Sequence, residues 1–222
     1  MPHAALLSAP ERAHVPTPAP RRRARVDRLE LCLQAVLSPS SLPSLAVCCP
    51  GRAMSQRLFL TRHAEAEHNA TGDYTIRDPA LTELGRRQAA SIAATNARAL
   101  EDCDLIVTSP LRRTIETTLL GFYGADASPR RRRVPIVLMP ELQEAGAHAC
   151  DVGSPADELR KLFADDLDVL DFSTCGDGWF DKTGANAPTA DALAARALYV
   201  RRWLRDRPEH NIVGALRLTR AG

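Results

Sequence analysis

The sequence predicts an α/β domain of three layers, in which helices cover both faces of a mostly parallel sheet. Two observations indicate this class. From residue 57 onwards short apolar runs alternate with amphipathic segments, and reactive side chains stand directly after two of the apolar runs. Strand, helix, strand, helix, strand is the order typical of a parallel sheet. Reactive groups in such sheets gather at the carboxyl ends of the strands.

The elements follow one another along the chain. We expect strands over 57–61, 104–109, 134–139 and 211–218, and helices over 83–100, 110–120, 156–169 and 189–206. Thr82 is the expected N-cap of the first of these helices. Leu84, Ile92 and Leu100 are expected to give it spaced apolar contacts. Pro110 suits the first turn of the next helix.

Composition sets limits on the partners of the chain. Hydrophobic residues make up 45% of the 222 positions, enough for a sizeable core. The formal net charge of +2 is too small to imply a polyanionic partner for the whole chain. Two arginine runs, at 21–25 and 130–133, favour solvated surface segments over contacts with nucleic acid or an anionic membrane. We therefore expect no nucleic-acid and no membrane partner.

The first 53 residues differ in composition from the rest. They are rich in Pro, Ala, Ser and Arg, and such a stretch buries little apolar surface per ordered residue. We expect residues 1–53 to be a disordered, low-complexity extension and 54–222 to form the domain. A mitochondrial presequence is the alternative, but the acidic residues Glu11, Asp27 and Glu30 disfavour it.

The cysteines favour a reducing compartment. Six are scattered along the chain, at Cys32, Cys48, Cys49, Cys103, Cys150 and Cys175. None forms a C-x-x-C pair, the spacing typical of zinc and redox sites. Scattered cysteines in a chain of this size indicate reduced thiols, so the predicted location is cytoplasmic.

A polar segment, RHAEAEHN, follows the first predicted strand. Its histidines, His63 and His68, are five positions apart, which does not fit the zinc motif H-E-x-x-H. We therefore expect no metal. Phosphate is the better candidate ligand, because Arg62 and Asn69 supply donors and a neutral imidazole can attack phosphorus. Arg112 and Arg113 offer further donors at the start of a helix after the next strand.

Five motifs stand in order between residues 55 and 213: RHAEAEHN, DPALTELGRRQA, TSPLRRT, MPELQEAGAHACDVGS and RALYVRRWLRDRPEHNIV. Together they resemble the histidine phosphatase superfamily, which has the phosphoglycerate-mutase-like fold, and more closely its fungal phosphoglycerate-mutase-like proteins. The resemblance implies a phosphomonoesterase that acts on a small phosphorylated metabolite through a phosphohistidine intermediate. It implies no cofactor, and it leaves the oligomeric state unspecified.

The resemblance also implies roles for particular residues. His63 aligns with the phosphorylated nucleophile. Arg62, Asn69 and Arg113 align with the phosphate-binding positions, and Arg112 with the rim. Glu144 aligns with the carboxylic acid that protonates the leaving alkoxide. The substrate pocket is expected to involve residues 145–185, which supply Trp179 and Lys182.

The chain departs from the family pattern at two places. Ala64 stands where glycine is usual. After NIVGA the family has a second catalytic histidine, whereas this chain reads LRLTRAG, and no histidine follows His210. The expectation is a domain that is truncated at its C-terminus. Two alternatives to a phosphatase therefore stay open: a phosphoglycerate-type mutase, or a catalytically impaired chain that only binds phosphate.

Overall fold

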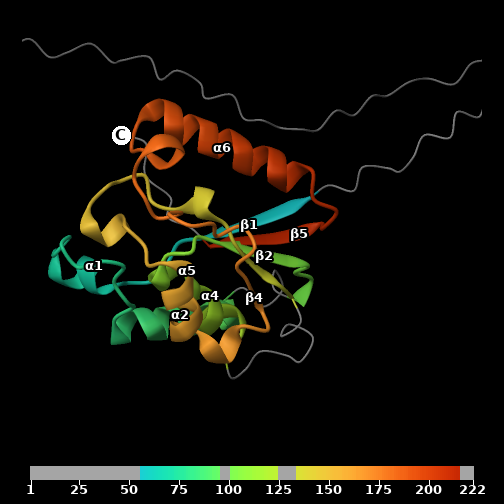
Figure 1. The fold of residues 1–222 in the computed structure, drawn as a ribbon. Helices are drawn as coiled ribbons and strands as arrows, with labels where there is room; N and C mark the ends of the chain where they lie inside the picture. The colour runs from blue at the N-terminus through green and yellow to red at the C-terminus, as the bar shows by residue number, and fades with distance from the viewer. Residues whose placement is uncertain (1–55, 96–100, 125–133, 216–222) are drawn as a thin grey trace, which may run out of the picture. The chain divides into compact units, whose positions relative to one another are not determined.

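The computed structural model describes residues 56–95, 101–124 and 134–215 (Figure 1). The predicted extension over 1–53, the arginine run at 130–133 and the residues after the last strand, 216–222, lie outside this described part. The division of the chain at residue 54 therefore stays a prediction. Within the described residues, no helix is long and apolar enough to cross a membrane.

The described strands are β1 (Arg57–Thr61), β2 (Leu105–Thr108), β3 (Ile136–Leu138), β4 (Leu170–Asp171) and β5 (Asn211–Ala215). The α-helices are α1 (Glu67–Thr71), α2 (Glu83–Thr95), α4 (Arg112–Phe122), α5 (Ala156–Leu162) and α6 (Ala190–Arg205). Short 3₁₀ helices are η2 (Pro140–Leu142), η3 (Ala149–Asp151), η4 (Ala164–Asp166) and η5 (Gly184–Asn186).

The five strands form one parallel sheet in the order β1-β5-β2-β3-β4. The last of the described strands, β5, is inserted between the first two. Gly214 of β5 lies opposite Leu60 of β1 on one side and opposite Val107 of β2 on the other. The carboxyl ends of β1, β5 and β2 therefore lie side by side, where parallel α/β sheets place their ligand sites.

Helices cover both faces of this sheet, which confirms the predicted three-layer α/β class (Figure 1). Consecutive residues of β2 point to opposite faces, as the pleat of a strand requires. Ile106 packs on the side of α2, α4 and α5. Leu105 and Val107 pack on the side of α6, against Trp203 and Leu204. Both faces of β2 are buried, which explains why its sequence is a continuous apolar run.

Helix α2 begins where its cap was predicted, because the Thr82 hydroxyl accepts a hydrogen bond from the Gly85 amide at 3.0 Å. The expected contact from Leu84 is wrong: this side chain is 45% exposed. The buried stripe of the helix instead contains Gly85 and Ala89, one turn apart. Gly85 faces the loop after β1 so closely that a Cβ there would lie 1.9 Å from the Glu65 carbonyl oxygen.

Three further elements differ from the sequence prediction. The helix expected over 156–169 ends at Leu162, because Phe163 leaves the helical conformation (φ −112°, ψ 36°) and buries its ring in the core. The short strand β4 and the single-turn helix α1 were not predicted. Both are too short to show a periodic apolar pattern, and β4 is defined only by its pairing with β3.

Candidate active site

His63 follows β1 directly and is buried, with 5% of its surface exposed. Its Nδ1 lies 2.7 Å from the carbonyl oxygen of Ala64. A carbonyl oxygen only accepts hydrogen bonds, so Nδ1 carries the proton and Nε2 carries the lone pair. Among the residues that the structure describes, Nε2 has no hydrogen-bond partner. This nitrogen is therefore a buried base with a free lone pair.

The surroundings keep this imidazole neutral. Burial lowers the pKa of His63 to about 3, and the positive charges of Arg113 and Arg62 act in the same direction. The hydrogen bond to Ala64 partly opposes them. At neutral pH the ring is therefore uncharged, which is the form that can act as a nucleophile.

The loop that carries His63 is held from two directions. The Ala64 amide donates to the Thr117 hydroxyl of α4 at 3.0 Å. Asn69, in α1, accepts from the Ala66 amide through its Oδ1 at 3.1 Å. The side-chain nitrogen of Asn69 lies 3.0 Å from His68 Nε2. Through these two contacts Asn69 holds the loop between β1 and α1 in place and also contacts His68.

A cavity of about 250 Å³ opens beside this loop. It is lined by Arg62, His63, Ala64, Glu65, Asn69 and Gln88. Three of the five predicted site residues, Arg62, His63 and Asn69, thus share one small polar cavity. The other two, Arg113 and Glu144, are not among its lining residues.

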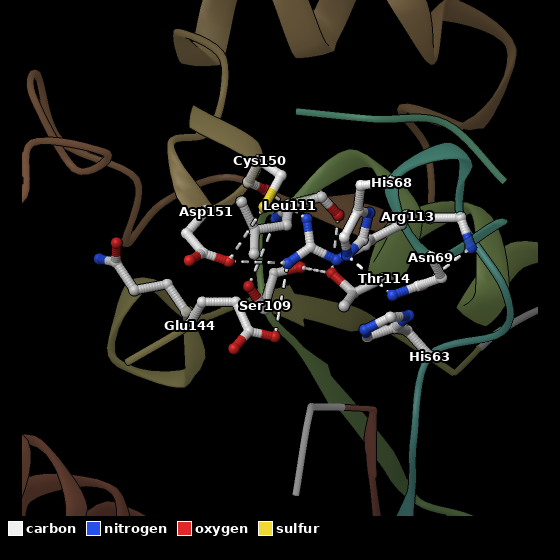
Figure 2. Close-up of polar contacts among 12 residues, drawn as sticks. His63, His68, Asn69, Ser109, Leu111, Arg113, Thr114, Glu144, Cys150 and Asp151 are labelled. Atoms are coloured by element: carbon white, nitrogen blue, oxygen red, sulfur yellow. Dashed lines mark hydrogen bonds and ion pairs between the residues drawn. The ribbon is translucent and has the colours of Figure 1, made fainter. Parts of the chain in front are cut away.

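Arg113, in the first turn of α4, is completely buried. Its Nη1 donates to the Cys150 carbonyl at 2.7 Å. Its Nη2 lies 3.4 Å from a carboxylate oxygen of Glu144 and 3.7 Å from one of Asp151. Figure 2 shows the guanidinium between these two carboxylates on one side and the rings of His63 and His68 on the other.

Arg113 therefore connects the two groups of predicted site residues, Glu144 on one side and the loop of His63 on the other. This residue pairs with Glu144 and its charge also acts on His63. Its Nε, like the Nε2 of His63, has no hydrogen-bond partner among the described residues. Two buried nitrogens without partners in one site, one a donor and one a base, indicate a place for a ligand that is anionic and electrophilic.

Asp151 is the site residue that sequence reasoning missed. It is 4% exposed and shares Arg113 with Glu144. Gly146 makes room for it, since a Cβ at this position would lie 2.3 Å from the carboxylate of Asp151. The signal available in the sequence was an acidic residue beside a cysteine a few positions after Glu144, but nothing local shows that it reaches Arg113.

Two expectations about the site need correction. The start of α4 does not offer its first amide to a ligand, because the Arg112 amide donates to the carboxylate of Asp78 at 2.9 Å. Trp179 does not present an exposed side chain to a substrate. It is 4% exposed and packs in the core, with its ring against Gly153. Lys182 contacts the Gln143 side chain and the Glu144 carbonyl. In the described part of the chain no group of three potential ligands could hold a metal ion.

Fold and site together define a parallel α/β protein with a neutral histidine and a buried arginine at the carboxyl edge of its sheet. The sequence profile of the histidine phosphatase superfamily (branch 1) matches residues 58–215. This match covers more than half of the chain and includes both His63 and Arg113. The chain belongs to the histidine phosphatase superfamily.

Individual proteins are also similar to this chain. A probable phosphatase of Schizosaccharomyces pombe is 31% identical over 116 residues, which are 50% of this chain and 51% of the relative. A phosphoglycerate mutase-like protein of Arabidopsis thaliana is 27% identical over 190 residues, covering 70% and 68% of the two chains. The match thus spans about half the length of the yeast relative. The solved structure of an ecdysone phosphate phosphatase from Bombix mori aligns over 72% of this chain and 71% of that chain, at 19% identity and a TM-score of 0.49.

Proposed function

We propose that this protein is a phosphomonoesterase that hydrolyses a small phosphorylated metabolite through a phosphohistidine intermediate at His63. The observation that carries the proposal is the buried, neutral imidazole whose Nε2 keeps its lone pair beside a polar cavity. The name of the yeast relative, a probable phosphatase, supports the same activity.

In the first step, Nε2 of His63 attacks the phosphorus atom and the bond from phosphorus to the leaving oxygen breaks. Arg62, Asn69 and Arg113 bind the phosphoryl oxygens, and the Nε of Arg113 is a donor without a partner among the described residues. Glu144, in its protonated form, gives its proton to the leaving alkoxide. The distance of 3.4 Å between Glu144 and Arg113, a proposed phosphate ligand, supports this role.

In the second step, a water molecule attacks the phosphorus atom of phosphohistidine. Glu144, now a carboxylate, takes a proton from this water, the bond between phosphorus and Nε2 breaks, and inorganic phosphate leaves. Neither step uses a metal or an organic cofactor. The chemistry rests on the histidine, the acid and three donors.

A mutase is the second candidate, favoured by the name of the Arabidopsis relative. It would return the phosphoryl group to the substrate instead of to water. Free phosphate and isomerised substrate, measured from the same reaction, distinguish the two activities. Binding of phosphate without either product would instead indicate the phosphate-binding chain.

The test is covalent labelling. Incubation with an aryl phosphate that carries radioactive phosphorus should label the chain transiently, with an adduct that is labile in acid and stable in base. His63→Ala should abolish both the label and turnover, whereas Cys103→Ala, at a buried thiol remote from this chemistry, should keep both. Full turnover in His63→Ala would contradict the proposal.

We also propose a cytoplasmic location and a small phosphorylated molecule as the only partner that the reaction needs. Two cysteines in the described part of the chain, Cys150 and Cys175, are buried free thiols, which supports a reducing compartment.

A further inference from the structure

We propose that Lys182 is a positioning residue that holds Glu144 in place for proton transfer to the leaving group. This inference rests on the proposed function, because it assigns a task to a residue only if Glu144 is the acid. In this role Lys182 holds Glu144 in place and does not contact the phosphoryl group.

The contacts of Lys182 are directed at the peptide that carries Glu144. Its ammonium nitrogen donates to the side-chain oxygen of Gln143 at 2.7 Å and to the carbonyl oxygen of Glu144 at 3.2 Å. Gln143 in turn donates from its side-chain nitrogen to the Trp179 carbonyl at 2.9 Å. Trp179 is itself buried in the core, so this chain of contacts ends in the hydrophobic core.

A second cation contacts the same peptide from helix α6. Arg196 is 5% exposed, and its two terminal nitrogens lie 3.3 Å from the Gln143 carbonyl oxygen and 3.5 Å from the Glu144 carbonyl oxygen. The carbonyl of Glu144 thus receives donors from Lys182 and Arg196, which come from different segments of the chain. Two cations on one peptide restrict how the backbone beneath Glu144 can move.

Glu144 needs such support because its own backbone is irregular. It follows η2 (Pro140–Leu142) and belongs to no helix or strand. A general acid must come within hydrogen-bonding reach of the oxygen that it protonates. A displacement of about 1 Å in such a group can cost roughly 100-fold in rate. Support from outside the segment is therefore a physical requirement of the proposed mechanism.

The charges around Lys182 leave it protonated at neutral pH. Burial lowers the pKa of Lys182 to about 8, and the carboxylates of Asp151 and Glu144 oppose this effect while Arg196 and Arg113 add to it. At neutral pH Lys182 is therefore still an ammonium ion with its three donors. Two of these donors already have protein partners, the Gln143 side-chain oxygen and the Glu144 carbonyl oxygen.

The experiment compares leaving groups. Dinitrophenyl phosphate releases a stable anion that needs no proton, whereas phenyl phosphate releases a basic phenolate that does. In Lys182→Met, kcat/KM for phenyl phosphate should fall about 100-fold, as expected for a misplaced acid. The value for dinitrophenyl phosphate and inhibition by inorganic phosphate should stay near those of the wild-type chain. Glu144→Gln should show the same selective loss.

The chain contains one other lysine, Lys161, on the exposed side of α5. Lys161→Met is the matched control and should behave as the wild type with both substrates. Lys182→Gln keeps a donor at this position without its charge. It should show a smaller selective loss, and it replaces Lys182→Met if that variant fails to fold.

Three results would overturn the inference. An equal loss with both substrates and weaker inhibition by phosphate would make Lys182 a phosphate ligand. An equal loss with a lowered melting temperature and unchanged phosphate inhibition would make its role structural. Unchanged activity would remove any role. A wild-type chain that hydrolyses neither substrate would instead overturn the proposed function, and this inference with it.

Discussion

At the scale of single residues, the chemistry of the site depends on a histidine that burial keeps neutral. The pKa of His63 is about 3 in the folded chain, against 6.5 as the ordinary value. Between these two pH values the unfolded chain binds a proton at His63 that the folded chain does not. The stability of the fold therefore falls as the pH falls below about 6.5, and above that pH this residue has no effect.

This linkage predicts the behaviour of His63→Asn. The variant cannot bind the proton in either state, so its free energy of unfolding should fall less between pH 7 and pH 5 than that of the wild-type chain. The difference should be on the order of 2 kcal/mol, since each pH unit below 6.5 contributes about 1.4 kcal/mol. Urea denaturation at both pH values measures it.

The exposed His210 supplies the control for this prediction. His210→Asn should leave the pH dependence of unfolding close to that of the wild-type chain. If His63→Asn and the wild-type chain lost the same stability on acidification, His63 would be protonated in the folded state at pH 5, and its role as a neutral nucleophile would need another explanation.

At the scale of elements, helix α4 depends on a cap that comes from elsewhere in the sequence. Its N-cap residue, Leu111, has no side chain that can accept a hydrogen bond. The buried carboxylate of Asp78 replaces it: one oxygen accepts from the Arg112 amide at 2.9 Å and the other from the Ser154 amide at 3.0 Å. Asp78 thereby joins α4, which carries Arg113, to the loop that follows Asp151.

We expect Asp78→Ala to lower the free energy of unfolding by on the order of 2 kcal/mol, the cost of losing a helix cap and a buried acceptor. Inhibition by phosphate should weaken too, because Arg113 stands in the first turn of the uncapped helix. Asp78 has a left-handed backbone (φ 42°), which asparagine tolerates and alanine does not. Asp78→Asn therefore shows the cost of losing a carboxylate acceptor alone, and the additional loss in Asp78→Ala measures the backbone strain.

Asp157 is the comparison for this element. It stands in the first turn of α5, exposed, and pairs with Arg160 at 3.1 Å. Asp157→Ala should change stability by a few tenths of a kcal/mol at most, as is usual for surface ion pairs. If Asp78→Ala and Asp157→Ala lowered the free energy of unfolding equally in chemical denaturation, the cap on α4 would stabilise the fold no more than a surface ion pair does.

At the scale of the whole described domain, β5 joins the two helical layers. Val213 faces the core formed with α2, α4 and α5, and Ile212 faces α6. The strand lies between β1 and β2, so neither neighbour is fully paired without it. We therefore expect the two layers to unfold as one cooperative unit.

Ile212→Ala tests this cooperativity. It should lower the free energy of unfolding by about 2–5 kcal/mol, as buried isoleucine-to-alanine changes do. The two tryptophans report on opposite faces, since Trp179 packs on the α4 side and Trp203 on the α6 side. Trp179→Phe and Trp203→Phe each leave a single tryptophan as the fluorescent reporter. The denaturation curves of these two variants should coincide, and Ile212→Ala should shift both by the same amount. A shift confined to the Trp203 signal would contradict a single unit.

The sequence by itself determined the local elements and the chemical types of the site. Apolar runs and their spacing identified the strands and most helices, because periodicity is a local property. Motif order predicted His63, Arg62, Asn69, Arg113 and Glu144 as site residues, and it correctly predicted the family. The order of the strands and the partners of Arg113 were decided only by the tertiary structure.

The reason is that these partners are distant in sequence and their contacts depend on how the sheet is assembled. Arg113 meets the Cys150 carbonyl 37 positions away, and Lys182 meets Gln143 39 positions away. No residue pattern near Asp151, Asp78 or Lys182 shows these contacts. They exist only once the segments that carry these residues are packed against one another, as when Arg113 of α4 meets Asp151 and Lys182 meets Gln143.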